Sequence, residues 1–277
     1  IWAGFFGLRQ GFGISSLPAK DLAHFDTRDG LSSKSAYGVQ RLKGGDLLLR
    51  MQKGLMRYDG EHFYAFEPIE ALAQQPVAHV YEAAGDTLYF ATEGAGVWRF
   101  DGERTAHWTV ADGLASDYVR DVLRSADGAL YFATLGGLSR YDGRSFRNYA
   151  VSDGLSSDDI RDLYEDEQGL LWLATDRGVV RFDGEVFDLL DYTDRQLGFP
   201  ERGNSLTAKL RTEGIYRGIN GEFFLATTSG FARYTGTDLD WITRVNARNR
   251  GYISNNHVEA IRQSPDGLLW VATHRGL

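Results

Sequence analysis

The 277-residue sequence contains no cysteine and only 5 prolines. Without cysteine the chain has no disulfide framework and no zinc site built on thiolates. No apolar run approaches the roughly 20 residues that a membrane-spanning helix needs. Basic residues are the minority charge, with 30 lysines and arginines against 38 aspartates and glutamates. The net charge of −8 argues against nucleic acid and against an anionic membrane surface as partners, because both attract basic faces.

The motifs of common catalytic and cofactor sites are missing as well. We find no His-Glu-x-x-His zinc motif, no phosphate-binding loop and no Gly-x-Ser-x-Gly nucleophile elbow. The acidic run Glu165-Asp166-Glu167 lacks the alternating spacing of a calcium loop, so a solvated turn is expected there. The sequence therefore predicts no catalytic residue, no metal site and no cofactor.

What the sequence has instead is a repeat, best seen over residues 168–184. Two short apolar strands are joined by a tight turn and closed by an Asp-Gly pair, and most copies carry a large residue just before Ala-Thr. Consecutive copies lie 41 to 52 residues apart. Strand-type units with a period of roughly 40–50 residues are typical of β-propeller blades. The anchor residues are Trp2, Leu48, Tyr89, Tyr131, Trp172, Phe224 and Trp270.

Each copy predicts four strands. In the unit that begins at Ser116, strands are expected at 118–123, 129–134, 138–141 and 145–149. The second is apolar on both faces, as expected for a strand packed between neighbouring blades. The connector Asp-Gly-Leu, at residues 29–31, 112–114 and 153–155, carries the chain from one unit to the next. Residues 191–221 stand apart, and an enlarged loop is expected there, either a tolerated insertion or a binding loop.

The predicted fold is therefore an all-β propeller of four-stranded antiparallel blades, with residues 1–277 forming one propeller segment. Seven anchors predict seven blades, of which the first and last are incomplete. Both ends of the chain fall within the motif, so we expect a segment of a longer protein. The ring of blades could close in two ways, which the sequence leaves open. Either flanking sequence completes the ring, or the two ends of the chain meet.

The order of connector, tryptophan strand and Arg-Phe-Asp-Gly turn resembles the two-component regulator propeller repeat, most clearly at 112–143 and 153–184. The resemblance implies the extracytoplasmic sensor region of a bacterial histidine kinase or hybrid kinase, hence a periplasmic location. It also implies a small-molecule or oligosaccharide ligand, of carbohydrate origin in many members, and a homodimer formed through the parent receptor. The output domain would lie outside these residues.

Ligand recognition is expected where the repeats differ, along the first strand of each blade. Polar or aromatic side chains there are expected at the mouth of the central channel, although a solvated lining without a ligand is the alternative. The candidate residues are Tyr37, His79, Arg120, Arg161, Lys209, His257 and Glu259. The repeated arginines Arg57, Arg99, Arg140 and Arg181 are expected to be structural, for example by pairing with a neighbouring blade.

Two other functions remain open at this point. Aromatic outer strands such as 63–66 would suit a protein-interaction scaffold. A propeller lyase or glycoside-processing enzyme would instead need an acid and a base, for which Asp121, Asp162 and Glu259 are the candidates.

Overall fold

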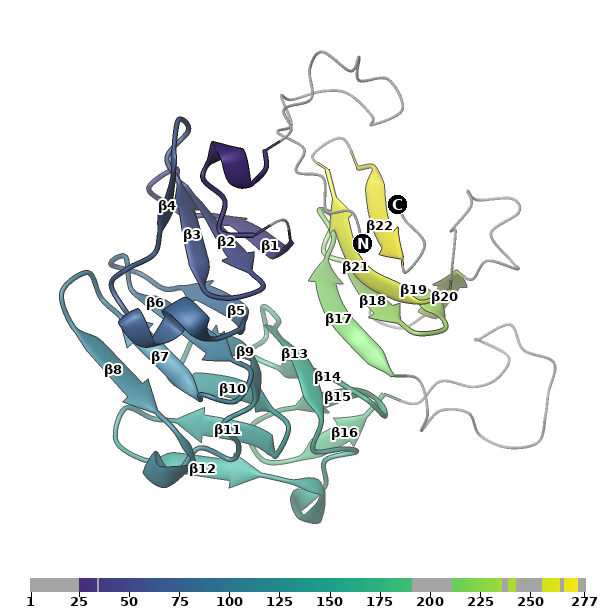
Figure 1. Cartoon of the computed structure of the whole chain (residues 1–277). Helices are drawn as coiled ribbons and strands as arrows, with labels where there is room; N and C mark the ends of the chain where they lie inside the picture. Colours follow the sequence, from purple (N-terminus) through teal and green to yellow (C-terminus); the bar gives the residue numbers. More distant parts are fainter. Residues whose placement is uncertain are drawn as a thin grey trace. The chain divides into compact units, whose positions relative to one another are not determined.

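The computed structural model describes residues 25–33, 35–190, 211–235, 239–242, 256–264 and 267–273 (Figure 1). In these ranges the regular structure consists of β-strands and short 3-10 turns, without an α-helix. The strands form five four-stranded sheets and one two-stranded sheet, and within each sheet they pair in chain order. This confirms the all-β propeller architecture with four-stranded antiparallel blades.

The described chain divides into two compact units. The first contains residues up to Glu93 together with Trp98–Ala106, and the second contains Gly94–Val97 and residues from His107 onward. The first unit holds β1 (Ala36–Arg41), β2 (Leu47–Met51), β3 (Leu55–Tyr58), β4 (Phe63–Ala65), β5 (Val77–Glu82) and β6 (Leu88–Thr92). The boundary crosses β7 (Val97–Phe100) and β8 (Thr105–Trp108).

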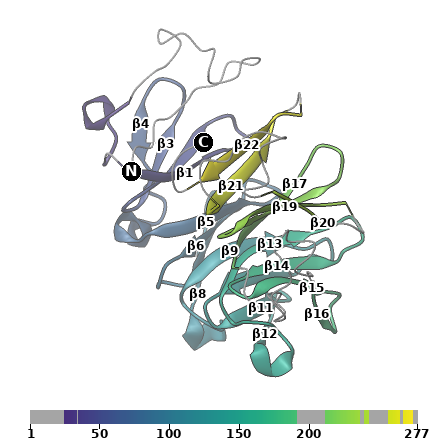
Figure 2. The same cartoon turned by 90° about the vertical axis from the view of Figure 1, so that its right-hand side faces the viewer.

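The second unit contains the remaining sheets. One consists of β9 (Val119–Arg124), β10 (Leu130–Thr134), β11 (Gly137–Tyr141) and β12 (Phe146–Tyr149), and the next of β13 (Ile160–Glu165), β14 (Leu171–Thr175), β15 (Gly178–Phe182) and β16 (Phe187–Leu189). Then follow β17 (Thr212–Arg217), β18 (Phe223–Thr227), β19 (Gly230–Tyr234) and β20 (Leu239–Ile242), and finally the pair β21 (Val258–Gln263) and β22 (Leu269–Thr273). Figure 2 shows these sheets from a second side.

The strands predicted for the unit at Ser116 coincide with β9, β10, β11 and β12 to within one residue at each end. The second strands β6, β10 and β14 are buried at all five positions, as expected for strands packed on both faces. One expectation for residues 191–221 is wrong: residues 212–217 form β17 rather than loop. Residues 191–210 lie outside the described part of the chain.

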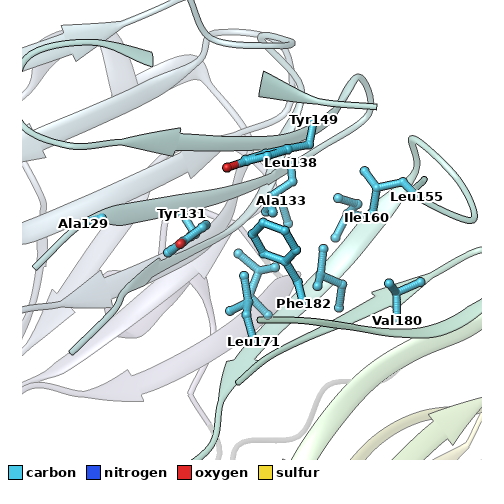
Figure 3. Packing of buried hydrophobic residues seen from close by; sticks show 12 residues of the cluster. Ala129, Tyr131, Ala133, Leu138, Tyr149, Leu155, Ile160, Leu171, Val180 and Phe182 are labelled. Atoms are coloured by element: carbon cyan, nitrogen blue, oxygen red, sulfur yellow. The ribbon is translucent and has the colours of Figure 1, made fainter. Parts of the chain in front are cut away.

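The core lies between successive sheets. One cluster combines Tyr131, Leu138 and Tyr149 of one sheet with Leu171 and Phe182 of the next (Figure 3). Aromatic contacts join the same two layers, since the ring centroids of Tyr149 and Phe182 are 5.0 Å apart. Between the next two sheets, Trp172 stacks on Phe223 with centroids 5.2 Å apart. The anchor aromatics therefore fill the space between blades, as predicted.

The repeated arginines have a structural role, but their partners are not in neighbouring blades. The register pairs the anchor with the arginine of the third strand, as in Tyr131 with Arg140 and Trp172 with Arg181. The guanidinium of Arg140 lies 5.9 Å from the Tyr131 ring centroid, within cation–π range. Its Nη2 is also 2.9 Å from Asp127 of the same sheet. Aromatic anchor and arginine thus recur together because they contact each other.

The Asp-Gly pairs after the third strands close tight turns. The Asp142 carboxylate accepts hydrogen bonds from the backbone N–H groups of Arg144 and Ser145, at 2.8 and 2.9 Å. Asp101 and Asp183 make the same two bonds in their own turns. These backbone donors hold the pKa of all three carboxyls below the usual range, because they stabilise the charged form.

The connectors between blades repeat a second local structure. A short 3-10 turn precedes the glycine in η3 (Thr27–Asp29), η5 (Val110–Asp112) and η6 (Val151–Asp153). Asp29, Asp112 and Asp153 each accept a hydrogen bond from the backbone N–H three residues earlier, at 2.7 to 2.9 Å. The leucine that follows the glycine is buried in each case. The fourth 3-10 turn, η4 (Glu70–Gln74), buries Leu72 instead.

Five complete blades and two strands of another are described. Of the last unit β21 and β22 are described, whereas the unit of Trp2 lies outside the described residues. Seven blades and a single propeller segment therefore stay predictions.

Candidate functional site

Each first strand carries the same irregularity near its beginning. In all six described sheets the register between the first and second strands shifts by one residue, which is a β-bulge. A bulge leaves one residue outside the hydrogen-bonded ladder and redirects its side chain, and bulges are frequent beside functional sites. The extra residues are Tyr37, Ala78, Arg120, Arg161, Glu213 and Glu259.

In the second unit the first strands β9, β13, β17 and β21 contact each other in order, as Figures 1 and 2 also show. Hydrogen bonds from the backbone of one strand to a carboxylate of the preceding one align β9, β13 and β17. The Asp121 carboxylate of β9 accepts a hydrogen bond from the N–H of Leu163 in β13, at 2.8 Å. One blade further, Asp162 accepts from the N–H of Ile215 in β17, at 2.7 Å. The four bulges are therefore held in one row.

The side chains at these bulges form one ion-pair network. Asp159, just before β13, lies 3.3 Å from Arg120 Nε and 2.8 Å from Arg161 Nη2. Arg161 Nη1 reaches Glu213 at 3.1 Å. Glu213 in turn lies 2.7 Å from Arg211 Nε. The network thus links three consecutive blades through alternating charges.

His257 extends the network to the last described sheet. Its Nε2 is 3.6 Å from Glu213 Oε1 and 3.3 Å from Glu259 Oε1. These two contacts become ion pairs when the imidazole is protonated. We define the bulge network as Arg120, Asp159, Arg161, Arg211, Glu213, His257 and Glu259.

The centre of the bulge network is buried and its ends are exposed. The side chains of Arg161 and Glu213 are 9% and 10% exposed, whereas those of Arg120 and Glu259 are 35% and 46% exposed. Charged groups this far from water are costly unless paired, so the central pair must be maintained by its neighbours. The ends of the bulge network are the parts that solvent or a ligand can reach.

Several buried atoms in the bulge network have no hydrogen-bond partner among the described residues, although ion-pair partners lie nearby. These atoms are Arg120 Nε, Asp159 Oδ1, Arg161 Nε and Glu213 Oε1. Buried polar groups are nearly always hydrogen-bonded, and the exceptions tend to mark functional positions or missing ligands and waters. Within the described residues, half of such atoms belong to this network.

Four of the seven residues proposed from sequence come together here, namely Arg120, Arg161, His257 and Glu259. Sequence analysis missed Asp159, Arg211 and Glu213. Glu213 occupies the bulge position of β17 that corresponds to Arg161 in β13. The predicted loop over 191–221 concealed the strand that carries it. Aligning the residues two places before Val122, Leu163 and Ile215 would have found it.

The remaining proposed residues are Tyr37, His79 and Lys209. Tyr37, at the bulge of β1, is 62% exposed, and His79 follows the bulge of β5 and pairs with Ala91. Both belong to the first unit. There Arg50 of β2 occupies the space above Gly38, where a Cβ would lie 2.3 Å from its Nη2, and donates to the carbonyl of Ala78. Lys209 lies outside the described residues.

Two of the three carboxylates considered for acid–base chemistry bind backbone groups. Asp121 and Asp162 each accept a backbone N–H from the next blade, and Asp121 is 5% exposed. Asp166, in the acidic run, accepts from the backbone N–H of Leu170 and from Trp172 Nε1, at 2.9 and 2.8 Å. Among the described residues, no group of three or more histidines, cysteines, aspartates or glutamates could hold a metal ion.

Comparison with known families confirms the repeat. The family model described as two component regulator propeller matches residues 154–177, which include β13 and the bulge residue Arg161. The chain therefore contains a repeat of the kind expected from its sequence. No curated protein shows significant sequence similarity to the chain.

Solved structures share the fold. The extracellular domain of the hybrid two component system BT3049 from B. thetaiotaomicron has a TM-score of 0.72 and 19% identity, over 90% of this chain and 33% of that chain. A second extracellular domain, of BT4673 from the same organism, has a TM-score of 0.56 and 17% identity, over 88% and 38%. The chain thus spans only about a third of the length of these proteins.

An enzyme has a similar fold as well. Catalytically inactive virginiamycin B lyase from Staphylococcus aureus, solved with quinupristin, has a TM-score of 0.62 and 12% identity, over 85% of this chain and 76% of that chain. At these identities all three similarities demonstrate a common propeller architecture.

Proposed function

We propose that this chain is a ligand-recognition propeller in the extracytoplasmic sensor region of a bacterial two-component receptor, and that it binds its ligand at the bulge network. The observation that carries the proposal is the bulge at one position of every described first strand. It brings Arg120, Arg161, Glu213 and Glu259 into one row, at a position where the blades differ in charge.

Three features favour recognition over catalysis. Asp159 and Glu213 of the bulge network are paired with arginines, so neither is set apart as a general acid or base. Asp121 and Asp162 are engaged by backbone donors. The repeat at 154–177 is of the two component regulator propeller type, and similar folds occur in extracellular domains of hybrid two component systems.

The proposed location and partners follow from the same reasoning. An extracytoplasmic propeller would meet a small molecule or an oligosaccharide in the periplasm, and a parent receptor could bring two copies together. No helix among the described residues is both long enough and apolar enough to cross a membrane. A nucleic-acid partner or membrane contact through this segment is not proposed, given the net charge of −8.

Binding to the purified chain tests this function. A panel of neutral, acidic and amino-containing oligosaccharides is screened by thermal shift, since a ligand that binds only the folded state raises Tm. Hits are measured by calorimetry with the variant Arg120→Ala, which we expect to weaken binding by about tenfold or more, the value of one charged hydrogen bond. Arg124→Ala, an exposed arginine at the far end of the same strand, is the control.

The proposal is wrong if the affinity of every ligand is the same in the Arg120→Ala variant, the control and the parent chain. Circular dichroism of the two variants ensures that a loss of binding is not a loss of folding.

A further inference from the structure

The first unit contains a groove between the sheet of β1 to β4 and the sheet of β5 to β8. Its volume is about 570 Å³, within the range of pockets that bind small molecules. Leu42, Phe66, Leu88 and Phe100 give the groove an apolar wall, and all four are buried or half-buried. All of its lining residues belong to the first unit, whereas the bulge network belongs to the second.

The groove is large where its blade departs from the repeat. The equivalent groove between the sheets of β9 to β12 and β13 to β16 has a volume of about 310 Å³, and the anchor Tyr131 lines it. In the first sheet the anchor is Leu48, which faces Arg57 across the ladder as Tyr131 faces Arg140. Leu48 is shorter than the aromatic anchors of the other described sheets and does not line the groove. The missing ring accounts for the larger volume.

A second departure from the repeat places a carboxylate in the groove. Asp86, two residues before β6, has a φ of 56°, whereas the other described blades have a glycine at this position with φ between 81° and 102°. Aspartate tolerates this left-handed conformation better than most residues, although less well than glycine. Asp86 is exposed, and among the described residues its carboxylate has no hydrogen-bond or ion-pair partner.

The charged residues that line the groove are mostly acidic. Arg57 is the base among them, and it pairs with Asp46. Lys43 lies between two lining residues in the chain, and its Nζ donates to the Ala83 carbonyl at 2.8 Å. With both bases counted, two negative charges remain in excess. The carboxylates of the lining are Asp46, Asp59, Glu82 and Asp86.

Two of these carboxylates are engaged by neighbouring groups and supply charge rather than free acceptor atoms. Asp59 accepts from the Tyr64 hydroxyl and from the backbone N–H groups of His62 and Glu61, which hold its pKa below the usual range. Glu82 accepts from the N–H of Lys43 with both oxygens, at 3.1 and 3.0 Å. Asp86 is therefore the carboxylate whose oxygens are available to a ligand.

We infer that this groove binds a small arylalkylamine, with the aromatic ring against Phe66 and Phe100 and the ammonium group at Asp86. The Phe66 and Phe100 rings meet edge to face with centroids 6.2 Å apart, an arrangement that a third ring can extend. Tyr64, which is 45% exposed, adds an aromatic face that attracts a cation. This site is separate from the bulge network, so the inference does not rest on the proposed function.

Selectivity follows from the apolar wall and the acidic groups acting together. An uncharged aromatic molecule gains only at the wall, and a cation without a ring gains only at the carboxylates. An aromatic anion gains at the wall but is repelled by the excess negative charge. The arylalkylamine is the class that gains at both.

The probe is phenethylamine, which is protonated at neutral pH, and its binding to the purified chain is measured by calorimetry. Phenethyl alcohol, hydrocinnamate and methylamine are the uncharged, anionic and ring-free analogues. We expect phenethylamine to bind at least about fivefold more tightly than each of them, the factor that one exposed ion pair supplies. Equal binding of phenethylamine and phenethyl alcohol, or no binding of phenethylamine, overturns the inference.

Two variants locate the probe in the groove. Asp86→Asn keeps the turn, because asparagine also tolerates a positive φ, and should weaken phenethylamine by about threefold to fivefold while leaving phenethyl alcohol unchanged. Leu48→Tyr restores the aromatic anchor and should weaken both probes by about tenfold, because the added ring occupies the groove. Circular dichroism checks the folding of each variant.

The matched control is Glu185→Gln, which removes an exposed carboxylate from the second unit and should change the affinity of neither probe. If Asp86→Asn binds phenethylamine as tightly as this control does, the ammonium group does not lie at Asp86 and the inference fails. That result is decisive even if Leu48→Tyr does not fold.

The bulge network provides the test of independence. Arg120→Ala should leave phenethylamine binding unchanged, and a loss of binding in this variant overturns the groove as the site. If phenethylamine binding depends on Asp86 while no ligand of the oligosaccharide panel depends on Arg120, the groove inference stands and the proposed function is wrong. The converse result supports the proposed function and overturns the inference.

Discussion

Gly137 opens β11 with a φ of 106°, a backbone conformation that residues with a side chain rarely adopt. A Cβ built there would lie 2.1 Å from the carbonyl oxygen of Tyr149, at the end of β12. The Thr134 hydroxyl closes the same turn by donating to the Gly137 carbonyl at 2.7 Å. The glycine and the threonine of the repeat are thus parts of one tight turn.

Replacing Gly137 by alanine should destabilise the fold. The backbone conformation alone costs about 1–3 kcal/mol for a residue with a side chain, and the clash with Tyr149 adds to it. Gly143→Ala is the control, because Gly143 has a similar φ of 95° but nothing within 4 Å of its Cβ position. Urea unfolding should give a larger loss for Gly137→Ala; equal losses would show that the close approach has no energetic weight.

At the level of residues, the sequence predicts what recurs and fails where partners come from distant positions. The anchor aromatics and the Asp-Gly turns are visible because each works within its own repeat. The pairing of Arg161 with Glu213 joins residues 52 positions apart, and no pattern within one repeat shows such a pairing. The extra residue interrupts the alternation of the strand, so that the buried positions Ile160 and Leu163 of β13 lie three residues apart.

Between elements, the last residue of a first strand repeatedly binds the turn of the preceding blade. Glu165 accepts from the backbone N–H of Ala126 at 2.8 Å and from the Ser125 hydroxyl. Glu82 accepts from the N–H of Lys43, and Gln263 from that of Ile219 at 2.7 Å. The neighbouring blades are therefore joined by polar contacts as well as by their apolar cores.

Removing one of these contacts should loosen the packing of two blades. Glu165→Ala loses two hydrogen bonds to the preceding blade, and we expect a loss of about 1–2 kcal/mol in the free energy of unfolding. Glu185→Ala alters an exposed residue in the turn before β16, which makes none of these contacts, and should change stability by less than about 0.5 kcal/mol. Chemical denaturation measures both, and a Glu165 effect no larger than that of Glu185 would refute this role.

Strand positions were predictable because each strand is short and bounded by turn residues. The error at 212–217 has a physical reason. β17 carries Gly214 at the position where β9 and β13 carry an aspartate, so its alternation is weaker and the surrounding glycines suggested a loop. Tertiary contacts with β13 and β18 hold this segment as a strand.

For the molecule as a whole, burial repeats with the period of the sequence. The second strands β6, β10 and β14 are buried along their whole length, whereas the fourth strands β4 and β16 have exposed residues at their ends. The free energy of local opening should vary in the same way.

Hydrogen exchange should therefore rise and fall about once per blade. We expect the slowest amide exchange in β6, β10 and β14, and the fastest in β4 and β16, in a measurement by mass spectrometry. The sheet of β17 to β20 provides an internal comparison of amide exchange, because its second strand β18 is buried at four of its five positions. Uniform protection across the four strands of each sheet would contradict this picture.

The position of each bulge residue outside the ladder has a consequence for how such a chain can change. A substitution at Arg120 or Glu259 leaves the strand pairing and the apolar layers on either side untouched, so the scaffold tolerates new chemistry there. Specificity and stability are thus largely separable in this architecture. Libraries randomised only at these positions offer a direct route to binding proteins with altered selectivity.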